Sequence, residues 1–189
     1  MREKLEAIVR KYVKRDGIEE LLQWASNNNF YNAWCSTSFH CNWAGGLAEH
    51  TYNVVINSLK LADAFDSKVD KESIVLCAFS HDLGKAGNYY VPNLLKSGKT
   101  SGTKPVKINP DLRIKSHAFR SLMIVSKFIE LSESERICIL CHDGFFEASN
   151  REYMLSLDEL LYIVHTSDLK SARFQEAVKN YKGGEKIDL

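Results

Sequence analysis

The chain has 189 residues, of which 44% are hydrophobic and 26% are charged, and its formal net charge is +1. These values fit one globular domain with an ordinary core, and the balanced charge gives no sign of a nucleic-acid, membrane-surface or acidic partner. No stretch is apolar enough to span a bilayer, and the N-terminus is charged where a signal peptide would be apolar. The chain has five cysteines, an odd number, which argues against a disulfide framework, so we expect a cytoplasmic location and no membrane partner.

Two amphipathic segments open the chain. Apolar residues recur at helical spacing over residues 3–14 and again over residues 17–25, which predicts two N-terminal helices. Residues 27–29 are three asparagines and predict a turn. The segment 30–39 is rich in aromatic and hydroxyl side chains, and we expect it to be irregular.

The middle of the chain predicts two longer helices. Gly45 and Gly46 break the chain before a strong helical pattern over residues 47–65. Residues 72–81 are apolar on nearly every side, and few of them are β-branched. This pattern predicts a helix buried in the middle of a bundle.

Residues 86–115 differ from the rest, because they contain all three prolines and no sustained helical period. We expect one long loop, with room for a short β-hairpin. The segment contains a single acid, Asp111. Its basic residues are Lys96, Lys99, Lys104, Lys107, Arg113 and Lys115. Alone, such a loop is a solvated flap, but beside a metal site it would be a lid and a clamp for phosphate.

Helical patterns resume over residues 116–130 and 134–142, and Ser132 with Glu135 predicts a capping box for the second of these. A final helix is expected over residues 157–180. The fold class predicted from these patterns is all-α: a single helical bundle interrupted by one long loop.

The histidines point to the chemistry. His81 and Asp82 are adjacent at the end of the most apolar helical segment. An ionised Asp in such a segment costs several kcal/mol unless a positive charge compensates it. A bound metal ion would compensate both residues.

Three segments make the sequence recognisable. GGLAEH (45–50), FSHDLGK (79–85) and HTSDLKSAR (165–173) resemble the HD-domain superfamily of metal-dependent phosphohydrolases, whose ligands follow the order His, His-Asp, distant Asp. STSFHCNWAGGLAEH (36–50) and SHAFRSLMIVSKFIELSESERICILCH (116–142) are similar to segments of a bacterial and phage group of HD hydrolases. The resemblance implies one HD-type domain over 1–189, with N-terminal helices in 1–29, the HD core in 30–173 and a frayed tail in 181–189.

The resemblance also implies a ligand set. One metal would be held by His50, His81, Asp82 and Asp168. A second would be held by His117 and His142, with Asp82 as the bridge. Imidazole and carboxylate suit Mn, Fe, Co, Ni or Zn better than Ca, with Mg also allowed, so we expect one or two such divalent ions as cofactors. Two close metals clamp a phosphoryl group and lower the pKa of a bridging water, so the expected nucleophile is hydroxide.

Asp82 and Lys85 are the expected catalytic residues. Lys85 follows Asp82 by three positions, and in the resembling family a basic residue there faces the site. It would bind phosphate or stabilise the leaving oxygen, whereas the alternative is a surface lysine at a helix end. His40, Arg173 and Tyr90 are the other expected substrate contacts.

Four further residues have simpler interpretations beside the functional ones. His142 at a helix C-terminus is favourable without any metal, and His165 lies on about the same helix face as Asp168, where it could support a ligand. Cys138 and Cys141 form a C-x-x-C, which we interpret as a buried apolar pair, because no second ligand pair for zinc is at hand.

The function expected from this pattern is hydrolysis of a phosphate ester or anhydride in a nucleotide, a cyclic nucleotide or a short oligonucleotide. The alternatives are a diiron oxygenase, as in the superfamily branch that resembles inositol oxygenase, and a non-catalytic nucleotide-sensing module that holds metal. The expected partner is a small phosphorylated substrate, because a net charge of +1 does not favour long nucleic acid. A homo-oligomer is left open.

Overall fold

The computed structural model describes residues 1–102, 104–156 and 158–176. Its main elements are helices, which confirms the predicted all-α fold class. They are α1 (Arg2–Tyr12), α2 (Ile18–Asn27), α3 (Gly46–Ala64), α4 (Lys71–Ser80), α5 (His117–Val125), α6 (Glu133–Cys141), α7 (Arg151–Met154) and α8 (Glu159–Lys170). None of the described helices is both long and apolar enough to cross a membrane.

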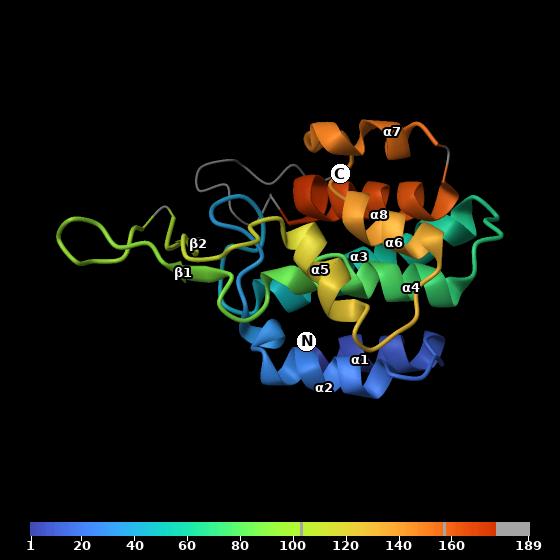
Figure 1. The fold of residues 1–189 in the computed structure, drawn as a ribbon, viewed down its shortest axis with the longest axis horizontal. Helices are drawn as coiled ribbons and strands as arrows, with labels where there is room; N and C mark the ends of the chain where they lie inside the picture. The colour runs from blue at the N-terminus through green and yellow to red at the C-terminus, as the bar shows by residue number, and fades with distance from the viewer. Residues whose placement is uncertain (103, 157, 177–189) are drawn as a thin grey trace.

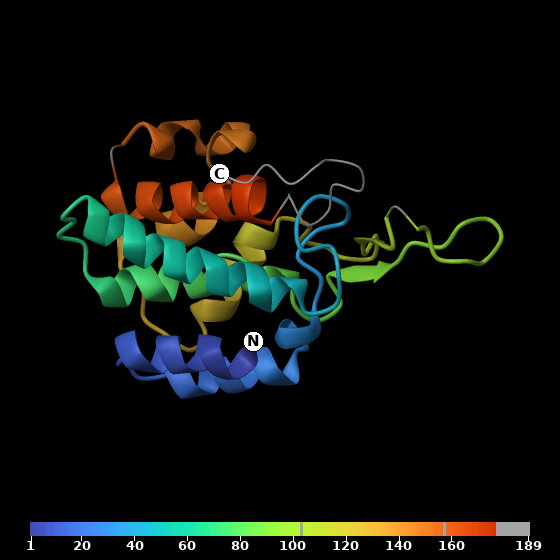
Figure 2. The same cartoon turned by 180° about the vertical axis from the view of Figure 1, so that it is seen from behind.

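The helices are stacked in layers around α4. Helix α3 packs against α4 and α8, and α6 packs against α5 and α8. Figures 1 and 2 show α1 and α2 covering one side of this central group, with α7 on the opposite side. Every residue of α4 from Ile74 to Ser80 is buried, so the expectation of a helix enclosed by the bundle is confirmed.

Side-chain caps fix where several of these helices begin. Asp70 accepts from the backbone N–H of Glu72 at the start of α4, and Ser116 accepts from Phe119 at the start of α5. Helix α6 begins with the predicted capping box, in which Ser132 and Glu135 each bond the other's backbone N–H. A cap of this kind contributes about 1 kcal/mol and satisfies N–H groups that the helix leaves unpaired.

The segment before α3 lies against the start of that helix. Gly45 has φ 86°, and its N–H donates to the Asn32 carbonyl at 3.0 Å. A Cβ on Gly46 would lie 2.0 Å from the Cys41 carbonyl oxygen. The two glycines therefore permit the mainly irregular segment of residues 33–45 to lie close to the end of α3 that carries His50.

The predicted hairpin is present in the long loop. Strand β1 (Tyr90–Pro92) pairs antiparallel with β2 (Val106–Ile108), with Val91 opposite Lys107. An isolated bridge between Leu94 and Thr100 continues the pairing toward the tip. Figure 1 shows this ribbon projecting away from the bundle rather than folding over it.

The structure corrects the ends of two predicted helices. The helix expected over residues 116–130 ends at Val125. The helix expected over 157–180 is α8 followed by a π-helical turn, Ser171–Gln175, where the Ser171 hydroxyl donates to the Ser167 carbonyl and disturbs the α-helical ladder. Residues 157 and 177–189, and with them the predicted tail, lie outside the described residues. Short helical turns over 144–154 were not predicted.

Glu135 is a buried carboxylate that ties three parts of the bundle together. Arg15, in the turn after α1, donates to both of its oxygens at 2.8 and 2.6 Å. Ser73 of α4 donates to Oε1 at 2.7 Å, and the Ser132 N–H donates to Oε2 at 2.8 Å. The charge of Glu135 is therefore fully compensated inside the protein.

Candidate metal centre

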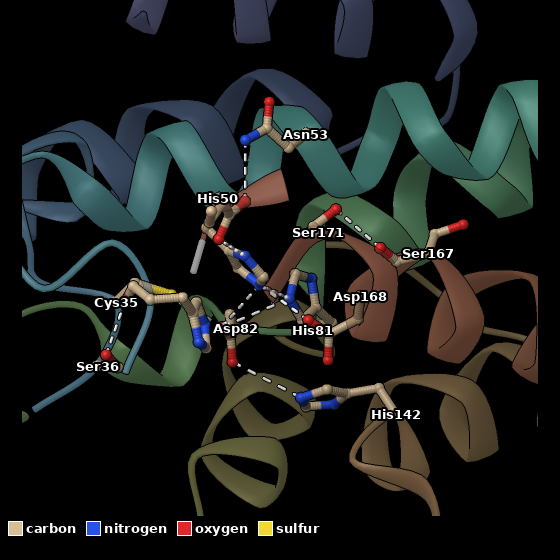
Figure 3. Close-up of polar contacts among 12 residues, drawn as sticks. Cys35, Ser36, His50, Asn53, His81, Asp82, His142, Ser167, Asp168 and Ser171 are labelled. Atoms are coloured by element: carbon tan, nitrogen blue, oxygen red, sulfur yellow. Dashed lines mark hydrogen bonds and ion pairs between the residues drawn. The ribbon is translucent and has the colours of Figure 1, made fainter. Parts of the chain in front are cut away.

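The six predicted ligands come from five helices or their ends and meet at one point. His50 lies in α3, His81 and Asp82 follow α4, and Asp168 lies in α8. The other two are His117, the first residue of α5, and His142, the residue after α6. Figure 3 shows His50, His81, Asp168 and His142 gathered around Asp82. Packing of α3, α4, α5, α6 and α8 thus brings together residues that are far apart in sequence.

One half of the cluster surrounds His50. Its Nε2 lies 3.3 Å from Nε2 of His81 and 3.0 Å from Oδ1 of Asp168. Oδ2 of Asp82 lies 3.4 Å from Nε2 of His81 and 3.7 Å from Nε2 of His50. These are the four residues that the family resemblance assigns to the first metal, and the structure places their donor atoms face to face.

The other half lies on the opposite oxygen of Asp82. Oδ1 is 3.3 Å from Nε2 of His117 and 3.6 Å from Nε2 of His142, and these two nitrogens are 3.2 Å apart. Asp143 adds a carboxylate oxygen 3.2 Å from Nε2 of His117. Each oxygen of Asp82 therefore faces its own pair of histidines, as a bridging ligand would.

Outward hydrogen bonds orient three of the imidazoles. Nδ1 of His81 donates to the Ala78 carbonyl at 2.7 Å, and Nδ1 of His142 donates to the Ile139 carbonyl at 2.8 Å. Nδ1 of His50 donates to Glu176 at 2.9 Å. Because carbonyls and carboxylates only accept, Nδ1 carries the hydrogen in each ring. Nε2 is left facing the cluster, where it can bind either a proton or a metal.

The donor set fits a divalent transition metal. Oδ1 of Asp82 is buried and has no hydrogen-bond partner among the described residues. A buried carboxylate oxygen without a partner is costly, and paired Nε2 atoms at 3.2–3.3 Å cannot both point a hydrogen at each other. His50–His81–Asp82, His81–His142–Asp168 and Asp82–His117–His142 each place their donor atoms within 4.8 Å of one another. A cation between them would satisfy all of these atoms.

Charges in the cluster are strongly coupled. Burial alone would raise the pKa of Asp82, but the charges of Lys85 and His81 hold that pKa well below its usual range. Nζ of Lys85 donates to Oδ2 of Asp82 at 2.7 Å. Burial lowers the pKa of His50, yet its bonds to Asp168 and Glu176 raise it to about 10. In the absence of metal, a proton on His50 thus serves as the compensating positive charge.

The second half of the cluster depends on a close approach between Gly84 and α5. A Cβ on Gly84 would lie 2.1 Å from the His117 carbonyl oxygen and 2.7 Å from Cβ of Arg120. Instead, the Gly84 N–H donates to the Ser121 hydroxyl at 2.8 Å, and Nε of Arg120 donates to the Gly84 carbonyl at 2.9 Å. This contact brings His117 within reach of Asp82.

Sequence reasoning missed two carboxylates at the site. Glu176 is completely buried, and its other oxygen accepts from Asn53 at 2.9 Å. Asp143 lies beside His117 and has a pKa held well below its usual range, against the effect of burial, by His142 and His117. The adjacency of Asp143 to His142 was a signal in the sequence, whereas Glu176 follows directly on an unpredicted π-helical turn and contacts His50 across the bundle.

A cavity of about 390 Å³ opens beside the cluster. Three predicted substrate contacts, His40, Lys85 and Arg173, line it, as does His165, whose Nδ1 donates to the carbonyl of His142 at 2.8 Å. Tyr90, the fourth predicted substrate contact, is not among the residues that line this cavity; its hydroxyl donates to the Cys35 carbonyl at 3.0 Å.

The basic residues of the 86–115 loop also lie elsewhere. None of them lines the cavity, and Figure 1 shows the β1–β2 ribbon projecting away from the bundle. In the described structure the loop is therefore not the lid that its composition suggested. The Cys138–Cys141 pair is buried, as expected, and contributes to none of the metal-ligand groups among the described residues.

Comparison with known proteins agrees with this geometry. The family model described as HD domain matches residues 47–172. The match covers well over half of the chain, so the chain belongs to the HD-domain family, and membership implies a metal-dependent hydrolase type of function. No curated protein and no solved structure matches the chain.

Proposed function

We propose that this protein hydrolyses a phosphate ester or anhydride of a small nucleotide, with two divalent metals held by the six-residue cluster. The observation that carries the proposal is the environment of Asp82. Its two oxygens face two separate histidine pairs, and Oδ1 has no hydrogen-bond partner among the described residues. Pairs of metals bridged in this way are typical of phosphoryl hydrolysis.

Bound metals would supply a hydroxide nucleophile at neutral pH and neutralise charge on the phosphoryl oxygens. The chain's own groups prepare the site for that chemistry. Lys85 lines the cavity while its ammonium group contacts Asp82, so it stands where it can donate to a phosphate oxygen. Burial lowers the pKa of Lys85, but the charge of Asp82 raises it well above its usual range, so Lys85 stays cationic throughout the physiological range.

The cavity supports a substrate with two unlike ends. Lys85, Asp143 and Asp168 form its polar wall, while Phe39, Phe146 and other apolar groups line the remainder. Phe39 and Phe146 are mostly exposed, at 67% and 69% of the residue surface. Exposed aromatic rings beside Lys85 and the proposed metals would suit a phosphate that carries a planar base.

Arg173 reinforces this assignment. Its guanidinium lies 5.5 Å from the ring centroid of Phe146, on the wall of the cavity. A planar cation stacked on an aromatic ring extends the flat surface available to a base and adds a donor for phosphate or sugar oxygens. The volume of about 390 Å³ lies at the small end of ligand pockets, which favours a mononucleotide or short oligonucleotide over a long strand.

The test is hydrolysis of a substrate panel by the purified full chain. Mononucleotides, cyclic nucleotides, dinucleotides and glycerol phosphate are incubated with protein loaded separately with Mn, Fe, Co, Ni, Zn or Mg. We expect release of phosphate or of a shortened nucleotide from at least one nucleotide substrate, and its loss on chelation. Asp82→Asn should be inactive, while Asp66→Asn, which changes an exposed carboxylate after α3, should retain full activity.

Failure would take recognisable forms. Equal activity of Asp82→Asn and the parent chain would show that the cluster is not the active site. Oxygen consumption by the iron-loaded protein with no phosphate release would replace the proposal with the oxygenase alternative. Tight nucleotide binding without turnover under every metal would replace it with the sensing module. The cation Lys85 beside Asp82 favours an anionic substrate over dioxygen.

A further inference from the structure

A cysteine and a histidine outside the six-residue cluster face its His50 half. Sγ of Cys35 lies 3.4 Å from Nε2 of His40, and the Cys35 thiol donates to Oδ2 of Asp82 at 3.9 Å. The rings of His40 and His50 have centroids 4.7 Å apart. Figure 3 shows Cys35 and His142 on different sides of Asp82. A soft ligand thus approaches the cluster from the loop before α3.

Cys35, His40 and His50 form a further group whose donor atoms all lie within 4.8 Å of one another. Nδ1 of His50 is bonded to Glu176, so Nε2 is the atom that this ring offers to a metal. The same Nε2 faces His81 and Asp168. One nitrogen lone pair binds one metal, so an ion held with Cys35 and an ion held with His81 and Asp168 exclude each other.

The loop that carries Cys35 and His40 is held in place by its own hydrogen bonds. The Cys35 N–H donates to the Cys41 carbonyl at 3.3 Å, and the Cys35 carbonyl accepts from Tyr90. The Ser36 hydroxyl donates to the His40 carbonyl at 2.7 Å. Cys35 is completely buried. The thiol and the imidazole are therefore fixed beside each other rather than meeting by chance at a mobile surface.

We propose that Cys35, His40 and His50 form an alternative site for a soft divalent cation such as Zn²⁺ or Cd²⁺, and that its occupation displaces the metal from His81 and Asp168. Asp82 Oδ2 is the fourth donor in reach, which gives a Cys-His₂-Asp set suited to tetrahedral zinc. Binding replaces the thiol proton of Cys35 and, in the metal-free protein, the proton on Nε2 of His50; both protons leave to solvent, and the ion takes over from Lys85 as the cation beside Asp82.

Ligand softness gives the site its selectivity. Thiolate ligands favour Zn²⁺ and Cd²⁺ over Mn²⁺ and Mg²⁺, whereas the His81 and Asp168 side offers only nitrogen and oxygen. The proposed site would therefore make the protein sensitive to soft metals. An ion bound at Cys35 would displace the metal held by His81 and Asp168. The inference rests on metal binding by His50 and goes beyond the proposed hydrolysis.

The first experiment follows cadmium binding by absorption. Cd²⁺ is titrated into the metal-free full chain, and the thiolate-to-cadmium charge-transfer band in the ultraviolet is recorded. We expect a band that saturates in the parent protein and is lost in Cys35→Ser. Cys141→Ala is the matched control, because Cys141 is also buried but packs with Met154 and Leu161 and belongs to no metal-ligand group among the described residues.

The second experiment tests displacement directly. Protein loaded with Mn²⁺ is titrated with Cd²⁺, and the paramagnetic resonance signal of free Mn²⁺ reports its release. We expect the first Mn²⁺ to leave as Cd²⁺ binds. His40→Gln, at a less buried position, should raise the Cd²⁺ needed for half-release by roughly 10- to 100-fold while Mn²⁺ affinity changes little. This variant keeps the test decisive if Cys35→Ser does not fold.

Three results would overturn the proposal. They are no thiolate band in the parent protein, a band of equal strength in Cys35→Ser, and cadmium binding that leaves manganese in place. None of these measurements depends on catalysis. A chain that hydrolyses no phosphate ester but shows the Cys35-dependent band would refute the proposed function and keep this site, and the reverse result would do the opposite.

Discussion

Two buried carboxylates, Glu135 and Asp82, show opposite ways of placing a charge inside one bundle. Glu135 accepts hydrogen bonds from Arg15, from the Ser73 hydroxyl and from the Ser132 N–H, and both of its oxygens are occupied. Asp82 accepts from Lys85 on Oδ2, while Oδ1 has no hydrogen-bond partner in the described part of the chain. Both side chains are almost completely buried.

The difference in hydrogen bonding distinguishes a structural carboxylate from one suited to bind a metal. A buried charge that the protein compensates completely can tie helices together and do nothing else. A buried carboxylate can instead keep an oxygen without a hydrogen bond, among imidazoles whose Nδ1 atoms are already bonded. Such a group is suited to bind a cation through that oxygen and the Nε2 atoms. Glu135 therefore belongs to the scaffold, and Asp82 belongs to the site.

The largest effect is expected at Asp82. Asp82→Asn removes the ligand common to both metal positions, so both ions should be lost, while Asp168→Asn should lose mainly the ion at His50 and His81. Metal content after dialysis, measured by elemental analysis, distinguishes the two variants. Activity of Asp82→Asn should fall by about 10²- to 10³-fold or more. Retention of one tightly held metal in Asp82→Asn would show that Asp82 is not the bridge.

Glu135→Gln should unfold the protein more easily without affecting the site. Removing this charge leaves the partly buried Arg15 guanidinium with only its longer ion pair to Glu72, at 3.4 Å, which should cost about 2 to 3 kcal/mol of the free energy of unfolding. Urea denaturation measures the loss, and metal titration of the folded variant is the control. A change in metal affinity as large as the change in stability would mean that the two carboxylates are not independent.

The same carboxylate predicts an acid limit to stability. Burial raises the pKa of Glu135, but hydrogen bonds from Arg15 and Ser73 lower it to about 2 from a value of 4.5 in the unfolded chain. A lowered folded-state pKa stabilises the protein above pH 4.5, and this contribution is lost as the pH falls toward 2. Denaturation of metal-free parent and Glu135→Gln proteins should therefore converge over that window. A difference in the free energy of unfolding that stays constant between pH 4.5 and pH 2 would contradict the lowered pKa of Glu135.

A smaller effect is expected at Glu176, which orients His50 without facing the cluster. Glu176→Gln keeps the size of the side chain but removes the charge that holds the His50 hydrogen on Nδ1. Metal affinity should fall by roughly 10- to 100-fold, as measured by calorimetry. Asn53→Ala, which removes the other partner of Glu176, should have the same direction and a lesser size. Unchanged affinity in both variants would make Glu176 a purely structural group.

The smallest effect is expected on the hairpin. Lys99→Gln with Lys104→Gln changes two exposed charges on a ribbon that projects from the bundle. Charges farther from the substrate than about 10 Å are largely screened at ordinary ionic strength, so KM should change by no more than about twofold. A much larger rise in KM would show that the ribbon folds over the cavity during turnover.

Much of the fold was readable because its signals are local. The caps at Ser132 and Glu135 and the apolar character of residues 72–81 each depend on a few neighbouring residues. The six ligands could be named because the family resemblance identifies the metal-binding positions, which residue spacing alone does not. Their meeting at Asp82 is a product of packing between α3, α4, α5, α6 and α8, which no local pattern encodes.

What the sequence did not predict is the direction in which segments and side chains point. The basic composition of the loop predicted a lid, but composition does not say which way a ribbon points. Tyr90 was assigned to substrate from its position after the HDLGK segment, whereas in the described structure its hydroxyl donates to the Cys35 carbonyl. Glu176 was missed because it lies inside a stretch predicted as regular helix, where a π-helical turn changes the direction of the side chain.

The close contact between Gly84 and α5 bears on how such a site could evolve. The proposed second metal position depends on a glycine that allows α5 to lie where a Cβ would collide with the His117 carbonyl. A single-base change converts a glycine codon to an alanine codon, and the added methyl group would push His117 away from Asp82. One mutation would then separate a two-metal ancestor from a one-metal descendant with all six ligands still present in its sequence, so a ligand motif alone does not count ions in this architecture.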